Sequence, residues 1–109
     1  MNIKVKYLNW DLANRNTEEE NEVCNAFFTG KVLDINDKNY RDINEYKYIT
    51  DGVNITRTLE EIYREHNRID DDSYCRLKSG QRSMCTGDLI FVDDVGYVVK
   101  NVGFEKIYI

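Results

Sequence analysis

The stretch RSMCTGDLIFVDD, residues 82–94, passes from a small polar turn into an uninterrupted apolar run and stops at two aspartates. Small hydroxyl residues in the turn can bond the local backbone, and Gly87 permits a positive φ angle. Asp88 closes this turn before the chain enters the core. The stretch therefore predicts a buried strand with a well-marked start.

Two more short strands follow this one. The segments DLIFV, GYVVKN and FEKIYI are separated by residues 93–96 and by residues 102–103. Separations this short suit hairpins, in which neighbouring strands run antiparallel. We expect a three-stranded meander at the C-terminal end.

The N-terminal part predicts a strand and a helix. Residues 3–8 alternate apolar and lysine side chains, the period of a strand with one buried face. Thr17 with Glu20 forms a capping box, so residues 17–28 should be helical, with Val23, Ala26 and Phe27 inward. Gly30 should end this helix.

A second helix is expected over residues 58–68. Thr58 is the expected N-cap, with Glu61 three residues further on. Apolar side chains then recur at helical spacing on one face. They are Leu59, Ile62, Tyr63 and His66.

The middle of the chain has weaker patterns. Residues 31–35 and 45–50 suit short strands, with a turn or one helical turn between them, and residues 53–56 suit a strand after an Asp-Gly turn. Together, these strand and helix patterns predict an α+β fold in one small domain, residues 1–109. It consists of an antiparallel sheet, including the C-terminal meander, with two helices packed on it.

The net charge of the chain bears on which kinds of macromolecule it can bind. Twenty acidic and fifteen basic residues give a formal charge of -5, and no basic patch is present to bind a nucleic-acid backbone directly. The acidic residues are clustered, which suits either a solvated surface or a face that meets a basic protein. No apolar run is long enough to cross a membrane, and three irregularly spaced cysteines indicate free thiols. We expect a cytoplasmic protein, and the resemblance described below implies a bacterial host cell.

No motif for catalysis, metal or cofactor binding emerges. The single histidine, His66, is not placed beside a cysteine by any pattern, and the cysteines lack the spacing of a zinc site. The aspartate runs lack the loop of an EF-hand, and no glycine-rich phosphate loop occurs. We therefore expect no cofactor, no metal and no enzymatic activity. A ribonuclease acting through His66 and acidic residues is the enzymatic alternative.

Residues 58–107 resemble YodL-like proteins, a family of small proteins of bacteria and their mobile elements. The resemblance lies in a helix ending at His66-Asn67, the turn 82–88, the strand 89–92, the tyrosine-led strand 97–99 and Gly103-Phe104. It implies no established enzyme, so these residues are markers of fold. Residues 1–57 form an N-terminal part without a recognised resemblance.

In its general character, though in no particular motif, this short, acidic and proline-free chain also resembles anti-CRISPR proteins directed at type II effectors. That resemblance implies an inhibitor that binds an RNA-guided endonuclease and blocks loading of guide RNA or DNA, its carboxylates imitating phosphates. The expected contacts are acidic residues with two aromatic anchors. They are Glu60, Glu61, Tyr63, Glu65, Asp70, Asp71, Asp72 and Tyr74.

The alternative is an interaction module of plasmid or conjugative-element biology. The C-terminal strand, residues 104–109, is apolar on one face and would be an open edge in a monomer. Pairing of two such edges would give a homodimer.

Overall fold

Two helices and a five-stranded antiparallel sheet make up the described part of the chain, which confirms the α+β class. The computed structural model describes residues 1–9, 18–48, 54–67, 75–77 and 81–108, with residues 18–23 by their backbone alone. The chain divides into two units. The sheet unit comprises Met1–Tyr48 and Cys85–Ile109, and the helical unit comprises Ile49–Met84. The single-domain organisation stays a prediction.

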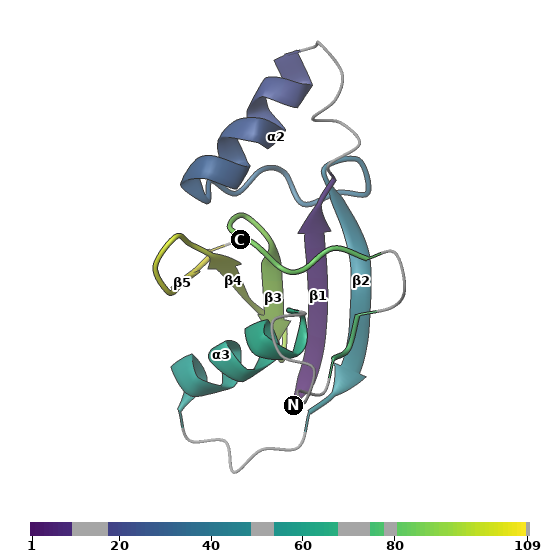
Figure 1. Ribbon diagram of the computed structural model, residues 1–109, viewed down its shortest axis with the longest axis vertical. Coiled ribbons are helices and arrows are strands. Elements are labelled where there is room, and N and C mark those ends of the chain that lie inside the picture. The colour runs from purple at the N-terminus through teal and green to yellow at the C-terminus, as the bar shows by residue number, and fades with distance from the viewer. Residues whose placement is uncertain (10–17, 49–53, 68–74, 78–80, 109) are drawn as a thin grey trace. The chain divides into compact units, whose positions relative to one another are not determined.

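The sheet has the strand order β2-β1-β3-β4-β5, and all its neighbours are antiparallel (Figure 1). Its strands are β1 (Asn2–Leu8), β2 (Tyr40–Lys47), β3 (Leu89–Val92), β4 (Val95–Val99) and β5 (Phe104–Lys106). The last three are neighbours in both sequence and space, so the predicted meander is confirmed. Its last strand is shorter than expected, because β5 ends at Lys106 and residues 107–108 are not part of it. β1 joins it by pairing Ile3 with Val92.

The predicted alternation of β1 is also confirmed. Ile3, Val5 and Tyr7 are buried on one face of the sheet, while Lys4 on the other face is exposed. Leu8 departs from the pattern because it is buried on the lysine face. It lies at the end of that face where α2 (Glu18–Thr29) packs, in a core cluster with Ala26, Tyr40, Leu89 and Val98.

The helix α2 ends as predicted. Gly30 has a φ of 73° and donates its N–H to the carbonyl of Ala26 at 2.8 Å. A left-handed glycine directly after the last helical residue satisfies a terminal carbonyl at little steric cost. Ala26 is buried and Phe27 is partly buried, as expected, whereas Thr17 lies outside the described residues.

β2 differs from the expected strands 31–35 and 45–50. Of the expected strand 45–50, residues 45–47 belong to β2, Tyr48 does not, and residues 49–50 lie outside the described residues. Residues 31–35 form no strand, and β2 begins at Tyr40, directly after a turn in which the Asn36 side chain accepts the N–H groups of Lys38 and Asn39. The register of β2 against β1 shifts between Val5 and Lys6. Such a bulge interrupts the period of two, which is why alternation alone misplaced the strand.

The turn between β3 and β4 is shorter than expected. Only Asp93 and Asp94 form it, with φ angles of 47° and 68°, and Val95 and Gly96 already belong to β4. Two central residues with positive φ match the right-handed twist of a hairpin. The two aspartates are therefore turn residues.

The second helix, α3 (Ile55–Glu65), begins earlier than predicted. Asn54 is the N-cap, and its side chain accepts the N–H of Arg57 at 3.3 Å. Thr58 lies one turn inside the helix, buried, with its hydroxyl donating to the Asn54 carbonyl. The expected N-cap and the expected strand over residues 54–56 are thus wrong, because asparagine caps a helix as well as threonine does.

Candidate functional site

The predicted acidic contacts on α3 lie in three different environments. Glu60 is exposed and forms no ion pair within the described residues. The Glu61 carboxylate lies 3.6 Å from the guanidinium of Arg57. Glu65 lies 2.6 Å from the Arg76 guanidinium, and both of these side chains are largely shielded from solvent. Of the three, Glu60 is the carboxylate most accessible to a partner.

The rest of the predicted contact set is only partly visible. Tyr63 is half-buried on α3, while Asp70, Asp71, Asp72 and Tyr74 lie outside the described residues. The sheet unit contains 13 Asp and Glu against nine Lys and Arg, and the helical unit seven against six. Most of the acidic excess therefore lies in the sheet unit, which contains none of the predicted contact residues.

A row of side chains crosses the lysine face of the sheet away from α2. The register places Glu45 of β2 opposite Lys4 of β1, and Lys4 opposite Phe91 of β3. Together with Asn2 and Asp94 these residues line a shallow depression of about 200 Å³. The site combines an aromatic side chain, an amide, one ammonium and two carboxylates.

The bulge in β2 determines which charges face the lysines. Because Ile43 is the extra residue, Asp42 comes to lie opposite Lys6. The Lys6 ammonium is 2.6 Å from the Asp42 carboxylate, whereas Lys4 and Glu45 are 4.0 Å apart and both more than half exposed. The Lys6 pair is tight, while the Lys4 pair leaves both of its charges available to a ligand.

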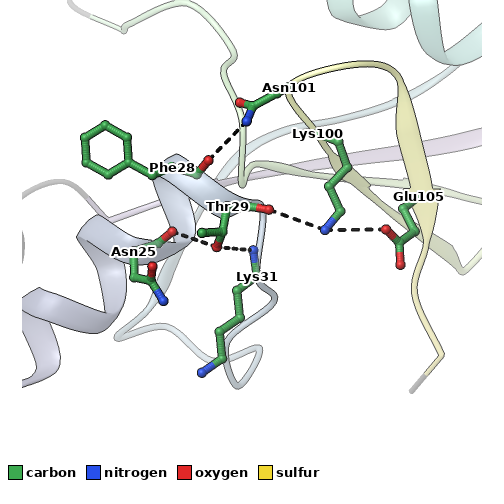
Figure 2. Close-up of polar contacts among 7 residues, drawn as sticks. All are labelled: Asn25, Phe28, Thr29, Lys31, Lys100, Asn101 and Glu105. Atoms are coloured by element: carbon green, nitrogen blue, oxygen red, sulfur yellow. Dashed lines mark hydrogen bonds and ion pairs between the residues drawn. The ribbon is translucent and has the colours of Figure 1, made fainter.

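A second exposed feature lies at the C-terminal end of α2 (Figure 2). The Phe28 carbonyl accepts the side-chain amide of Asn101 at 3.2 Å, and the Thr29 carbonyl lies 3.5 Å from the Lys100 ammonium. Lys100 also pairs with Glu105 at 3.4 Å. The hairpin of β4 and β5 therefore holds the helix end in place.

The Phe28 ring itself points away from these polar groups (Figure 2). Its exposed fraction is 76%, although its backbone is held by Asn101. Phe28 was not among the predicted contact residues, although the sequence carries a signal for its exposure. Phe27 and Phe28 are consecutive, and neighbouring helical residues point about 100° apart, so only one of them can face the core.

Asp88 is a fully buried carboxylate whose two oxygens both accept backbone N–H groups. One oxygen accepts the N–H of Leu8 at 2.9 Å and the other accepts that of Cys85 at 2.8 Å.

The buried Tyr40 phenol has a raised pKa. Burial is the main cause, and the negative charge of Asp88 adds to it, whereas the hydrogen bond that Leu33 N–H donates acts in the opposite direction. The Tyr40 phenol is therefore neutral at physiological pH.

His66 ends α3 and is fully buried, with its Nδ1 atom 2.8 Å from the Ile62 carbonyl. The cysteines Cys24, Cys75 and Cys85 are free thiols. Among the described residues, no group of three or more His, Cys, Asp or Glu side chains is arranged to hold a metal ion. The described helices include none that is long and apolar enough to cross a membrane.

Comparison with known proteins adds no assignment to this site. No family model matches the chain, and no curated protein or solved structure matches it significantly. The resemblance of residues 58–107 to YodL-like proteins accordingly stays a prediction.

Proposed function

We propose that this protein is a non-enzymatic inhibitor that binds a basic nucleic-acid-binding protein, and that its target is an RNA-guided CRISPR endonuclease whose loading with guide RNA or DNA it blocks. One observation supports this most. Exposed carboxylates without an ion pair in the described part of the chain occur in both units. They are Asp34, Asp37, Glu60 and Asp94.

The physical basis is competition for cationic side chains. A channel that holds a guide–target heteroduplex is lined with positive groups that contact phosphates. Carboxylates form charge-assisted hydrogen bonds with the same groups, and opposite net charges also accelerate encounter. A carboxylate that forms no ion pair within the described residues breaks no such pair when it binds a partner. Affinity for the endonuclease should therefore fall steeply between low and high salt.

Glu60→Gln should weaken binding to the purified endonuclease about fivefold, since an accessible charge contact contributes about 1 kcal/mol. Biolayer interferometry with immobilised endonuclease measures this change. Glu65→Gln is the matched control on the same helix, because the Glu65 carboxylate is already paired with Arg76. It should leave the affinity unchanged. Equal affinities of both variants and the parent would remove Glu60 from the interface.

Phe28→Ala should weaken binding about tenfold, because exposed aromatic side chains on a fixed backbone are frequent anchors of interfaces. Its stability should stay within about 0.5 kcal/mol of the parent, since the Phe28 side chain is 76% exposed. Tyr108→Ala is the control, because Tyr108 is 88% exposed and lies after β5. If the two variants lose affinity equally, Phe28 has no special role.

The sheet order supports a second candidate, an interaction module that forms a homodimer. β5 is the terminal strand of the sheet, and a terminal strand can extend a sheet across two copies. Light scattering over a hundredfold range of concentration tests this candidate. A constant monomer mass would eliminate it.

The enzymatic alternative has a direct assay. Labelled guide RNA is incubated with the protein, with and without magnesium, and the proposal expects the RNA to stay intact. Cleavage that disappears in His66→Ala would replace the inhibitor by a ribonuclease. The burial of His66 and its contact with the Ile62 carbonyl favour a capping role for this side chain.

A further inference from the structure

We propose that the depression lined by Asn2, Lys4, Glu45, Phe91 and Asp94 is a binding site for the guanidinium group of an arginine side chain. The inference rests on the proposed function in one respect, namely that the arginine belongs to the basic partner. The chemistry of the site itself can be tested without that partner.

The site is positioned by regular structure on three sides. Glu45, Lys4 and Phe91 form one row across β2, β1 and β3, and Phe91 pairs in turn with Gly96 of β4. A Cβ atom on Gly96 would lie 3.0 Å from Cε1 of Phe91 and 2.6 Å from Cγ1 of Ile107. The absence of a side chain at Gly96 therefore lets the Phe91 ring lie close against the neighbouring strand.

The turn beside the depression is fixed by hydrogen bonds. The Asp93 carboxylate accepts the N–H of Asn2 at 2.7 Å, and the Asp93 N–H donates to the Asn2 carbonyl at 2.9 Å. These bonds hold Asp94, the next residue, at the rim. The Asp94 carboxylate forms no ion pair within the described residues.

The charges of the site favour a cation. Two carboxylates and one ammonium line it, and the ammonium of Lys4 lies 4.0 Å from Glu45. An exposed pair at this distance contributes little, so a ligand can replace it. A phosphate bound here would be repelled by two carboxylates and attracted by only one ammonium group. The excess of carboxylates over ammonium groups therefore disfavours an anion at this site.

Among cations, a guanidinium suits the site better than an ammonium. A guanidinium is planar, so it can stack on an aromatic ring such as that of Phe91, and it presents five N–H donors that carboxylates can accept. An ammonium is more strongly hydrated and lacks a flat face. The size agrees, because about 200 Å³ holds a guanidinium with the end of its stem, whereas pockets for whole small molecules begin at about 300 Å³.

A titration with N-acetyl-arginine amide, followed in a two-dimensional amide NMR spectrum of the full chain, tests the site. We expect saturable shifts at Lys4, Glu45, Phe91 and Asp94, with a dissociation constant on the order of 1 mM for such a small probe. N-acetyl-citrulline amide has the same shape without the charge and should cause no saturable shift. N-acetyl-lysine amide should bind at least threefold more weakly.

Two variants locate the binding. Asp94→Asn and Glu45→Gln should each raise the dissociation constant at least fivefold. Asparagine tolerates the positive φ of 68° at Asp94, so this variant keeps its turn. Asp37→Asn removes an exposed carboxylate outside the depression and should change nothing. Equal responses to arginine and citrulline, or unchanged binding in both site variants, would overturn the inference.

The same variants separate this inference from the proposed function. If Asp94→Asn loses the arginine probe but keeps its affinity for the endonuclease, the site accepts a guanidinium that is not the target's, and the partner assignment fails. If the arginine probe does not bind while the endonuclease does, the guanidinium site is refuted and the inhibitor proposal stands.

Discussion

Asp88→Ala is expected to lower the free energy of unfolding by about 4 kcal/mol, the largest effect of any single substitution considered for this protein. The carboxylate is fully buried and accepts two backbone N–H groups, those of Leu8 and Cys85. Leu8 lies beyond the last pair between β1 and β3, which joins Lys6 to Leu89. The Asp88 side chain therefore continues the hydrogen bonding where the β3 backbone no longer does.

The conservative variant makes this prediction sharper. Asp88→Asn should cost about 2 kcal/mol, because an amide has one acceptor oxygen and its NH₂ group would face a second N–H donor. Asp93→Asn is the matched control. Asp93 also accepts a backbone N–H, from Asn2, but it is exposed, so water replaces the lost bond at a cost below about 1 kcal/mol. Urea denaturation followed by circular dichroism measures all three. Equal losses in the two asparagine variants would contradict the structural role of Asp88.

Gly87→Ala is expected to lower the free energy of unfolding by about 3 kcal/mol. Gly87 has a φ of 93°, and a Cβ atom there would collide with Cδ1 of Leu8 and lie 2.8 Å from the carbonyl oxygen of Ala26. The Leu8 side chain can move, but the Ala26 carbonyl belongs to the backbone of α2. The variant must therefore displace the helix from the turn as well as strain the backbone.

Gly103→Ala separates these two contributions. Gly103 also has a positive φ, 75°, but an added Cβ atom would meet nothing within 4 Å. The free energy of unfolding of Gly103→Ala should be lower than that of the parent by about 1 kcal/mol, the cost of backbone strain alone. The difference between the two urea midpoints, converted with the measured slopes, then reports the steric contact with α2. Equal losses at both glycines would show that this contact is absent.

Local patterns predicted those elements whose signals are carried by neighbouring residues. The alternation over Ile3–Tyr7 in β1, the glycine that ends α2, the buried face of α3 and the antiparallel order of the C-terminal meander were correct. The errors arose where two local signals compete. Asn54 and Thr58 are both good caps, and the bulge at Ile43 hides the period of β2. Sequence spacing alone has no means of ranking such alternatives.

The candidate sites show the same division. Sequence clustering selected Glu60, Glu61 and Glu65 together, but their different distances from Arg57 and Arg76 distinguish them. The depression was not foreseen, because its lining comes from three strands that are distant in the chain. Lys4 pairs with both Glu45 and Phe91 only through the sheet register.

By itself, the sequence determined the class of fold, the ends of several elements and the acidic character of the chain, since each depends on composition or on residues a few positions apart. Tertiary structure decided the place of β1 between β2 and β3, and it decided the burial of Asp88. It also brought together the residues that line the depression, which are Asn2, Lys4, Glu45, Phe91 and Asp94. These features depend on long-range pairing, in which the backbone bonds of one strand are satisfied by residues far along the chain. A local sequence pattern does not show which distant strand provides these hydrogen-bond partners.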